Sequence, residues 1–471
     1  MNERLKQSIL KNRDRTAYIV RDERMTYGEL WERASAAAEM LKRQGTAPVL
    51  LYGHKEIAMF VSLAACILAG RTYVPVDHST PVQRIEKIAA ASGATLMLRE
   101  GTFILPGLAC CTLDELAQYE TLEPKETVGD IVYIIFTSGT TGEPKGVPIS
   151  NANLTSFVNW VTALPPLSDY RNIAVLNQAS FSFDLSVADL FYSLCGGHTI
   201  VALERETQEN YSGIFDVLAE HSVELAVVTP TFMKLCLLNE EFRAENFPSL
   251  RCVYLCGEPL EPKTVRKLFG RFPGLCVINA YGPTEATSAV SGIVIQEEML
   301  DDLLLPVGEV GNFAADITIE ENEIVLRGDS VFGGYLNDHA GGHFRENGQN
   351  GYRTGDLGFI RNGKLYCRGR KDSQIKYKGY RIELTDIEHN LGDIPEVREC
   401  AVIAKYTDAS VVKAIRAFVV WQGGTQPDAA YLRDKLKKRL PDYMIPKTIR
   451  FLDRLPVNQN GKTDRKALYE L

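Results

Sequence analysis

Short apolar runs alternate with amphipathic segments over most of the chain. The runs end at turn residues, and the clearest are "IVYIIF" at 131–136, "LAVVTP" at 225–230, "RCVYLCG" at 251–257 and "LCVINAYG" at 275–282. Between such runs lie helical patterns, for example the Ala-rich segment "YGELWERASAAAEMLKRQG" at 27–45, which ends at a glycine. Buried strands of parallel sheets have this continuous apolar character. The pattern predicts an α/β fold with mostly parallel sheets, in which ligands bind beyond the carboxyl ends of the strands.

The pattern changes after about residue 370. The segments "RECAVIAKY" at 398–406 and "KAIRAFVVW" at 413–421 look like paired strands, and "AAYLRDKLKKRL" at 429–440 is an amphipathic helix. These elements predict a small α+β domain. We expect a large N-terminal domain over 1–371 and the small domain over 372–471. The join, "GRKDSQIKYKGYRIE" at 369–383, has the polar composition of an exposed linker.

Length and charge exclude several classes of function. A chain of 471 residues exceeds what one hydrophobic core usually serves, which agrees with at least two domains. The formal net charge of -8 argues against nucleic acid as the main partner, because phosphate backbones are bound through an excess of Lys and Arg. The start of the chain is too charged for a signal peptide, and the best apolar candidate, at 58–70, is too short to span a bilayer. We therefore expect no membrane insertion and a cytoplasmic location, where the ten scattered cysteines stay reduced.

A loop of hydroxyls and glycines follows the first of these apolar runs. Its residues are Thr137, Ser138, Gly139, Thr140, Thr141 and Gly142, with Lys145 just beyond. Phosphate oxygens are bound by such hydroxyls, by unhindered backbone N–H groups and by a nearby cation. The Walker pattern places Gly, Lys and Ser or Thr side by side, whereas here Glu143 and Pro144 precede the lysine. The loop predicts a phosphate site of another kind, and a plain surface turn is the alternative.

The loop sequence "TSGTTGEPKG" at 137–146 resembles the signature of the adenylate-forming superfamily. This superfamily contains acyl-CoA synthetases, luciferases and the adenylation domains of nonribosomal peptide synthetases. Further segments match its motifs in order along the chain: "FSFDLSV" at 181–187, "YGPTEAT" at 281–287, "YRTGDLG" at 352–358, "GRKDSQIKYKGYRIEL" at 369–384 and "NGKTDR" at 460–465. One match would be weak, but six in the right order indicate membership. The resemblance implies the fold of that superfamily, with a large N-terminal domain and a mobile C-terminal domain.

The resemblance also implies ATP and Mg²⁺ as cofactors and a reaction in two steps. A carboxylate attacks the α-phosphate of ATP to give an acyl-adenylate and pyrophosphate, and a thiol then attacks the activated carbonyl. Two anions meet in the first step, which favours positive charge and metal at the meeting point. By resemblance, Lys462 is the catalytic residue that contacts both anions.

The other ATP-site roles follow from the same resemblance. Tyr281 is expected to stack on adenine, Asp356 to accept hydrogen bonds from the ribose, and Thr284 to bind phosphate. Glu285 is expected to help hold Mg²⁺, which takes oxygen ligands. The full set of expected ATP-binding residues is Thr137, Ser138, Gly139, Thr140, Thr141, Gly142, Lys145, Ala280, Tyr281, Gly282, Thr284, Asp356, Arg370 and Lys462. For each of them the alternative is a turn residue or part of a surface ion pair.

In this superfamily the small domain rotates between the two steps. The rotation withdraws the lysine and presents the loop around Lys378, Gly379 and Tyr380 to the thioester site. The resemblance places the hinge at Asp372, next to Ser373, because a hinge needs only a few residues that absorb a backbone change.

The motif "FDLSV" narrows the class of acid. In the amino-acid-activating branch its aspartate, here Asp184, pairs with the substrate ammonium, which rejects plain fatty or aryl acids because a buried charge would stay unpaired. An aspartate that caps a helix is the alternative. The substrate-binding residues implied by the resemblance are Asp184, Leu185, Cys256, Gly257, Ala280, Ser288 and Ala289.

Within that branch the chain is similar to the D-alanine:D-alanyl carrier protein ligase family, which supplies D-alanine to teichoic acids. The similar stretches include "LNQASFSFDLSVADL" at 176–190, "LCGEPL" at 255–260 and "FPGLCVINAYGPTEAT" at 272–287. In that family the cysteine of "CGE", here Cys256, is linked to the preference for D-alanine, although a lone cysteine after a strand is more often a small core residue. The chain departs from the family pattern around the side-chain pocket, at Ala188, Tyr254, Ala280 and Ser288.

Several functions remain open on the sequence alone. The first is ATP-dependent activation of a small amino acid, D-alanine above others, and its transfer to the phosphopantetheine of a separate carrier protein, since no carrier or condensation motif is visible. The second is a free-standing adenylation enzyme that loads another small amino acid for a nonribosomal peptide. The third is a coenzyme A ligase, which would not need Asp184. The fourth is an inactive scaffold protein, and the presence of Lys462, Asp356 and Glu285 argues against it because such a protein would not need them.

Overall fold

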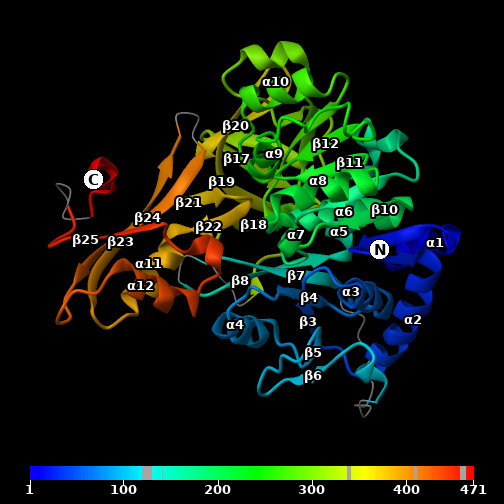
Figure 1. The fold of residues 1–471 in the computed structure, drawn as a ribbon, viewed down its shortest axis with the longest axis horizontal. Helices are drawn as coiled ribbons and strands as arrows, with labels where there is room; N and C mark the ends of the chain where they lie inside the picture. Colours follow the sequence, from blue (N-terminus) through cyan, green and yellow to red (C-terminus); the bar gives the residue numbers. More distant parts are fainter. Residues whose placement is uncertain (119–129, 140–141, 337–340, 408–410, 457–462) are drawn as a thin grey trace.

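The computed structural model describes residues 1–118, 130–139, 142–336, 341–407, 411–456 and 463–471. Figure 1 shows a large N-terminal unit and a smaller C-terminal unit, coloured orange to red, on its left side. No helix among the described residues is long and apolar enough to cross a membrane.

Two large, mostly parallel sheets form the N-terminal unit. The first has the order β14-β13-β12-β11-β9-β10-β1-β2, with β14 and β2 antiparallel at its edges. Its strands are β1 (Thr16–Val20), β2 (Glu23–Thr26), β9 (Ala174–Asn177), β10 (Thr199–Ala202), β11 (Leu225–Val228), β12 (Cys252–Leu255), β13 (Cys276–Tyr281) and β14 (Ser291–Val294). The apolar runs at 225–230, 251–257 and 275–282 are thus neighbouring parallel strands, as predicted.

The second sheet has the order β6-β5-β3-β4-β7-β8, with only β8 antiparallel to its neighbour. Its strands are β3 (Val49–Gly53), β4 (Tyr73–Asp77), β5 (Leu96–Arg99), β6 (Ala109–Cys111), β7 (Ile131–Thr137) and β8 (Lys145–Ser150). The apolar run at 131–136 belongs to this sheet and not to the one formed by the other three runs. The hydroxyl and glycine loop therefore approaches the ligand edge of the first sheet from a second sheet.

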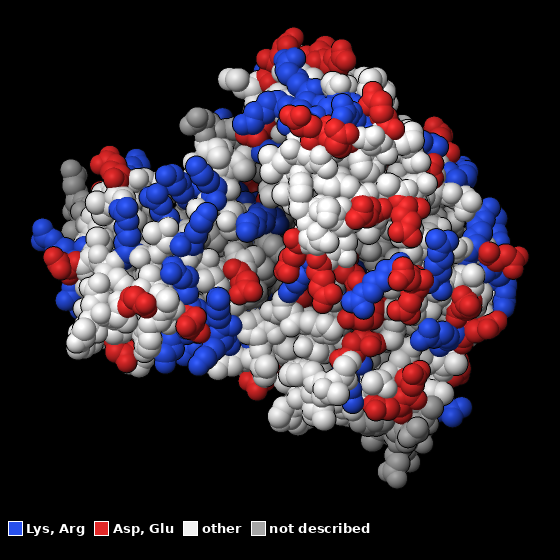
Figure 2. Space-filling model, viewed as in Figure 1, with Lys and Arg blue, Asp and Glu red and all other residues white. Residues whose placement is uncertain are grey.

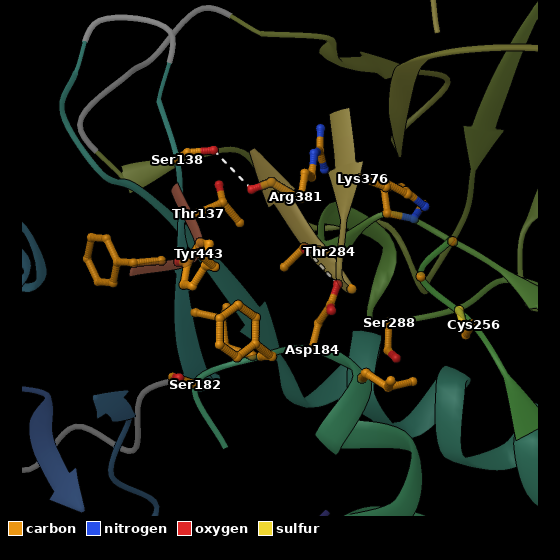
Figure 3. A pocket seen from close by; sticks show the side chains of 18 of the residues that line it. Thr137, Ser138, Ser182, Asp184, Cys256, Thr284, Ser288, Lys376, Arg381 and Tyr443 are labelled. Atoms are coloured by element: carbon orange, nitrogen blue, oxygen red, sulfur yellow. Dashed lines mark hydrogen bonds between the residues drawn. The ribbon is translucent and has the colours of Figure 1, made fainter. Parts of the chain in front are cut away.

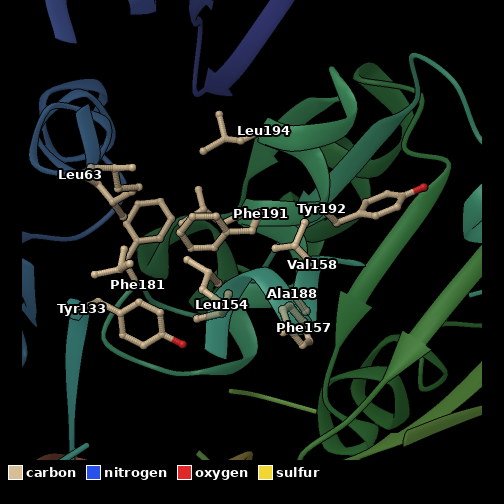
Figure 4. Close-up of a cluster of buried hydrophobic side chains, with 14 of the residues drawn as sticks. Leu63, Tyr133, Leu154, Phe157, Val158, Phe181, Ala188, Phe191, Tyr192 and Leu194 are labelled. Atoms are coloured by element: carbon tan, nitrogen blue, oxygen red, sulfur yellow. The ribbon is translucent and has the colours of Figure 1, made fainter. Parts of the chain in front are cut away.

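Helices separate the two sheets and cover their outer faces. Buried side chains of α2, α3, α5 and α6 form one core with the facing sides of both sheets, and Figure 4 shows Leu63 of α3, Leu154 of α5, Phe191 of α6 and Tyr133 of β7 in this core. Each buried side chain of this size contributes ~1.5–3 kcal/mol to stability. A second core joins α8, α9 and α10 to the outer face of the first sheet, and a third joins α4 to the second sheet. The helices of this unit are α1 (Asn2–Lys11), α2 (Tyr27–Arg43), α3 (Ile57–Ala69), α4 (Val82–Ser92), α5 (Asn151–Ala163), α6 (Leu185–Gly196), α7 (Arg205–Glu209), α8 (Tyr211–Glu220), α9 (Pro230–Cys236) and α10 (Pro262–Arg271).

Local sequence explains where these helices begin and end. The Thr26 side chain accepts a hydrogen bond from the backbone of Glu29, whose side chain accepts one in return, so α2 begins with a capping box. Gly45, at φ 88°, follows the end of α2 as predicted. The apolar segment at 58–70 is the buried helix α3, which ends at the left-handed Gly70.

A third, antiparallel sheet with the order β15-β20-β19-β17-β16 follows in the chain, and β18 pairs with β19. Its strands are β15 (Gly308–Glu309), β16 (Asp316–Glu320), β17 (Glu323–Arg327), β18 (His343–Glu346), β19 (Gln349–Arg361) and β20 (Lys364–Arg370). Strand β19 carries Asp356, and β20 carries Arg370 directly opposite it.

The C-terminal unit is a small α+β structure, as the sequence predicts. Its sheet has the order β23-β24-β25, and its core contains side chains of α11 and α12. The elements are α11 (Leu384–Gly392), β23 (Val397–Tyr406), β24 (Val412–Trp421), α12 (Ala429–Lys437), β25 (Thr448–Phe451) and α13 (Arg465–Glu470). The domain boundary after residue 371 stays a prediction.

The prediction of an exposed linker at 369–383 is wrong. This segment forms the end of β20 and then a hairpin of β21 (Gln374–Tyr377) and β22 (Tyr380–Glu383). Ile375 and Ile382 belong to the core of the C-terminal unit, because strand alternation turns them inward while polar neighbours turn outward. The two-residue turn has Lys378 and Gly379 at φ 54° and 83°, the left-handed pair that a tight hairpin requires.

Candidate functional site

A pocket lies beyond the carboxyl ends of β7, β12 and β13, where the two large sheets and the hairpin β21–β22 meet (Figure 3). Its lining residues are Ile135, Phe136, Thr137, Ser138, Ser182, Phe183, Asp184, Leu185, Cys256, Gly257, Gly282, Pro283, Thr284, Ser288, Asp356, Arg370, Lys376, Gly379, Arg381 and Tyr443. Figure 2 shows the hollow between the two units, with Lys and Arg side chains gathered along its C-terminal side. A positive rim attracts anionic substrates.

Asp184 lies at the start of α6, but its carboxylate does not cap the helix. One carboxylate oxygen accepts a hydrogen bond of 2.5 Å from the Thr284 hydroxyl instead. Burial raises the pKa of Asp184, and the nearby Lys376 and Arg381 oppose this increase only in part. A helix-capping role is therefore excluded, and the carboxylate is a partly buried acceptor that lines the pocket, without a salt-bridge partner in the described part of the chain.

Cys256 follows β12 directly and lines the same part of the pocket. Burial raises the pKa of its thiol to about 11, so the sulfur is a neutral contact surface at neutral pH and not a nucleophile. Leu185 and Gly257 also line the pocket, whereas Ala280 and Ala289 are buried and are not among its lining residues.

Ser288, which lines the pocket, has an unusual backbone conformation and a buried hydroxyl group. It has φ 72°, directly after Thr287 at φ 60°, and two successive left-handed residues that are not glycine are uncommon. Its buried hydroxyl has no hydrogen-bond partner among the described residues. The close packing of this backbone also explains Gly282, where a Cβ would lie 2.5 Å from the Cα of Ala289.

A chain of polar contacts runs along one side of the pocket. The Tyr281 hydroxyl donates to one oxygen of Asp356 at 2.7 Å, and Arg370 donates to the other oxygen at 2.7 Å. Arg370 also donates to both oxygens of Asp372, at 2.8 and 2.7 Å. The expected adenosine residues and the expected hinge residue are thus directly connected. Asp372 also accepts from the backbone N–H of Gln374, which ties it to the first residue of the hairpin.

Glu285, the expected metal ligand, is almost fully buried next to the pocket. Its carboxylate accepts a hydrogen bond of 2.5 Å from Tyr335 and is paired with Arg381 of β22. Burial alone would raise the pKa of Glu285, but the Arg381 guanidinium and the Tyr335 hydroxyl hold it below its usual value. No group of three or more His, Cys, Asp or Glu in the described residues could hold a metal ion by itself. A single carboxylate suits Mg²⁺ that is bound mainly through substrate phosphates.

The hydroxyl and glycine loop reaches the pocket through Thr137 and Ser138. Ser138 uses its hydroxyl to contact the C-terminal unit: it donates to the Arg381 carbonyl at 3.1 Å and accepts from the Glu383 N–H at 2.9 Å. Lys145 begins β8, with its Nζ 5.7 Å from the centre of the Tyr335 ring. Gly139 and Gly142 are not among the lining residues. Thr140, Thr141 and the expected catalytic Lys462 lie outside the described residues.

Sequence reasoning expected Lys462 and the loop at 378–380 at the site, but it did not name three other residues of the C-terminal unit that line the pocket. These are Lys376 and Arg381 of the hairpin, together with Tyr443. Tyr443 stacks on Tyr380 with ring centres 3.7 Å apart, and Phe183 of the large unit lies edge-on to Tyr380. The alternation of polar and apolar residues around Lys378-Gly379 was the signal that could have identified a hairpin here in place of a linker.

The chain matches two family descriptions. The family described as AMP-binding enzyme matches residues 5–336. The family described as AMP-binding enzyme C-terminal domain matches residues 386–462. The D-alanine–D-alanyl carrier protein ligase of Listeria monocytogenes serotype 4b is 38% identical over an alignment 494 positions long, which covers 97% of this chain and 96% of that protein. The protein of the same name from Bacillus licheniformis is 36% identical, with the same two coverages.

Solved structures agree with this assignment at the level of the fold. An adenylation domain of Vibrio cholerae, solved with glycyl-adenosine-5'-phosphate, has a TM-score of 0.85 and 24% identity over 99% of this chain and 96% of that one. An o-succinylbenzoate CoA synthetase of Bacillus subtilis has the same TM-score with 25% identity, over 99% of this chain and 98% of that one. Both structural matches extend over the large and the small unit of this chain. The fold predicted from the sequence motifs is confirmed, and the chain belongs to the AMP-binding enzyme family.

Proposed function

We propose that this chain activates D-alanine with ATP as D-alanyl-adenylate and then transfers the aminoacyl group to the phosphopantetheine thiol of a separate carrier protein. The observation that carries this proposal is the partly buried Asp184 carboxylate, which lies in the pocket next to Thr284 and has no ion-pair partner in the described residues. An α-amino acid brings an ammonium group that would pair with it, whereas a fatty or aryl acid would leave the charge unpaired. The names of the full-length relatives support D-alanine as the amino acid.

The pocket residues divide between the two parts of the adenylate. Tyr281 and Asp356 would bind the adenosine, with Arg370 holding the Asp356 carboxylate in place. Thr284 would bind the α-phosphate, beside the ammonium site at Asp184. Lys462 would contact both the attacking carboxylate and the α-phosphate in the first step, where charge develops on the phosphate oxygens.

The β- and γ-phosphates of ATP would lie against the hydroxyl and glycine loop, with Lys145 as the cation. Mg²⁺, when bound, would neutralise these phosphates and stabilise the departing pyrophosphate. Glu285 would hold the ion together with phosphate oxygens, because Mg²⁺ in such sites takes one or two carboxylates and substrate phosphates. In the described arrangement the Glu285 carboxylate is instead paired with Arg381.

The side-chain end of the pocket fits a small amino acid. Cys256 and Leu185 supply apolar contact surface, and Cys256 would border the substituent on the α-carbon. We propose that this contact sets the preference between the two enantiomers. A difference of one methylene in such a pocket contributes only ~1–3 kcal/mol to selectivity.

The two-domain description remains part of the proposal. Residues 1–371 would bind ATP and the amino acid, and residues 372–471 would rotate about Asp372 between the two steps. The enzyme would work in the cytoplasm, and the carrier would deliver D-alanine for modification of teichoic acids.

One observation favours a second candidate, a free-standing adenylation enzyme that loads another small amino acid onto a peptidyl carrier. The unpartnered Ser288 hydroxyl could accept or donate a hydrogen bond to a polar substrate side chain. An amino acid slightly larger or more polar than alanine would then be the substrate.

Pyrophosphate release with hydroxylamine as the trap tests the proposal. The panel contains both enantiomers of alanine and serine, glycine, and a few fatty and aryl acids. The expected result is a rate of pyrophosphate release that is much higher with D-alanine than with the other acids. A higher rate with another amino acid would favour the second candidate. Pyrophosphate release with only the fatty or aryl acids would overturn the assignment of Asp184 as the ammonium partner.

A further inference from the structure

We propose that Lys55 is a positioning residue for the amino-acid site. Its buried ammonium group holds the β9–α6 loop, residues 178–184, so that Asp184 at the end of this loop stays in place beside the pocket. This inference rests on the proposed function, in which Asp184 pairs with the ammonium group of the substrate.

The first observation is the complete burial of the Lys55 side chain, which follows β3. It is 0% exposed, which is rare for lysine because the charge is removed from water. Its Nζ donates hydrogen bonds to the side-chain oxygen of Asn177 and to the carbonyl of Ala179. The same Nζ lies 4.5 Å from the centre of the Phe181 ring. Burial lowers the pKa of Lys55 to about 8, so the group stays charged at neutral pH and binds the end of β9 and the loop after it.

The counter-charge to Lys55 lies in α6, the helix that follows the loop. Asp189 of α6 is 0% exposed, and the Asn177 side chain bridges the two charges. Its amide donates to one Asp189 oxygen at 2.7 Å, and its oxygen accepts from Lys55. The other Asp189 oxygen has no hydrogen-bond partner in the described residues. A buried carboxylate with so few partners depends on a nearby cation, so Lys55 stabilises the start of α6 as well as the loop.

A second contact holds the same loop at Ser180. The Ser180 hydroxyl donates to Asp77 at 2.7 Å, and Asp77, the last residue of β4, also accepts from Arg205 at 2.9 Å. Lys55 and Asp77 thus both reach the loop from the carboxyl ends of neighbouring strands of the second sheet. Because the loop has two anchors, the loss of Lys55 should loosen it without preventing the large unit from folding.

The loop leads from these anchors directly into the pocket, which residues 182–184 line. Asp184 accepts its hydrogen bond from Thr284 at this point. A shift of the loop by about 1 Å would move the carboxylate away from its productive position, and displacements of this size are costly in enzymes. The expected adenosine residues Tyr281 and Asp356 lie on β13 and β19 and bond to each other. Lys55 should therefore affect binding of the amino acid much more than binding of ATP.

Initial rates of pyrophosphate release, with hydroxylamine as the trap, test this split on the full chain with D-alanine and ATP varied separately. Lys55→Met keeps the length of the side chain but removes the ammonium group. The KM for D-alanine should then rise about tenfold or more, while the KM for ATP changes less than about twofold. Lys55→Gln keeps an N–H donor and should lie between Lys55→Met and the wild type. Equal increases in both KM values would overturn the proposal.

A double variant separates positioning from stability. Lys55→Met leaves the Asp189 carboxylate buried without its cation, so the midpoint of thermal unfolding should fall. Lys55→Met with Asp189→Asn removes that charge too and should regain much of the midpoint. The KM for D-alanine should stay high in the double variant, because the Ala179 carbonyl still lacks its donor. Recovery of this KM together with the midpoint would make Lys55 a stabilising residue only and would overturn the proposal.

The matched control is Leu51→Ala, which removes a buried side chain of β3 in the core between the two sheets. It should lower the midpoint of unfolding because it leaves a cavity, but both KM values should stay as in the wild type. A rise of the KM for D-alanine in Leu51→Ala as large as that in Lys55→Met would also overturn the proposal.

Hydrogen exchange tests the structural part of the inference without any activity. In Lys55→Met the amides of residues 179–187 should exchange about tenfold faster than in the wild type, while those of β12 should not change. Unchanged exchange at 179–187 would overturn the proposal. If no amino acid is activated at all, the proposed function fails, while the exchange experiment still decides whether Lys55 holds the loop.

Discussion

Thr284 donates a 2.5 Å hydrogen bond to Asp184, although the two residues are 100 positions apart in the sequence. One belongs to the turn η3 (Thr284–Ala286) after β13, and the other to the start of α6. The contact joins the expected phosphate residue to the expected ammonium residue. With the ammonium at Asp184 and the α-phosphate at Thr284, as proposed, the substrate carboxylate would be held close to the phosphate that it attacks, which is what proximity catalysis requires.

Replacing Asp184 should abolish most activation of amino acids. Asp184→Asn keeps the shape but removes the charge, and amino-acid-dependent pyrophosphate release should fall about 10- to 100-fold, in line with the loss of a charged hydrogen bond. The exposed Asp316→Asn on β16 is the matched control and should leave the rate unchanged. Full activity of Asp184→Asn would remove the ammonium argument.

The apparent affinity for the amino acid should depend on pH through Asp184. Because burial raises its pKa, this carboxylate takes up a proton at a higher pH than an exposed aspartate. The protonated form cannot pair with an ammonium group, so KM for the amino acid should rise as the pH is lowered from about 8 to about 5. The same titration of Asp184→Asn should show a high KM with no such dependence, and parallel curves for the two proteins would contradict the assignment.

Asp356 is expected to contribute mainly to ATP binding. Its two oxygens are held by Tyr281 and Arg370, so Asp356→Asn should raise KM for ATP about tenfold and change KM for the amino acid much less. Initial rates with each substrate varied separately measure this. A larger change for the amino acid than for ATP would show that the adenosine lies elsewhere.

Cys256 should influence the choice between enantiomers. Cys256→Ala enlarges the pocket by a small volume, and the ratio of kcat/KM for the two enantiomers of alanine should change about 3- to 10-fold. Cys236→Ala, which removes a similarly buried thiol of α9, is the control and should leave the ratio as in the wild type. An unchanged ratio in both variants would make Cys256 a packing residue only.

Lys462 is expected to act in the first step alone. Lys462→Ala should lower adenylate formation about 100-fold or more, because it removes a charged donor from the developing phosphate charge. Transfer to a carrier thiol from a chemically supplied aminoacyl-adenylate should stay close to the wild-type rate. Lys466→Ala on α13 is the control, and equal losses in both steps would contradict the predicted role.

Some features could be predicted because they depend on neighbours in the sequence. The alternation of apolar runs and helical patterns predicted β11, β12 and β13, and alternation also predicted the pair β23 and β24. The polar composition of 369–383 led to the wrong prediction, because composition alone does not distinguish a linker from a hairpin whose polar face lines a pocket. Ile375 and Ile382 are buried only because the C-terminal unit covers them.

The sequence by itself determined the class of fold, the order of the motifs and the residue types available for chemistry, since each depends on spacing and local periodicity. Only the tertiary structure decided which of these residues meet. The contact of Ser138 with Glu383 spans 245 positions, and the pair of Glu285 with Arg381 spans 96. Such contacts depend on how two sheets and a separate unit pack together, and no local pattern carries that information. The same packing decided that the expected metal ligand is held by an arginine in this arrangement of the molecule.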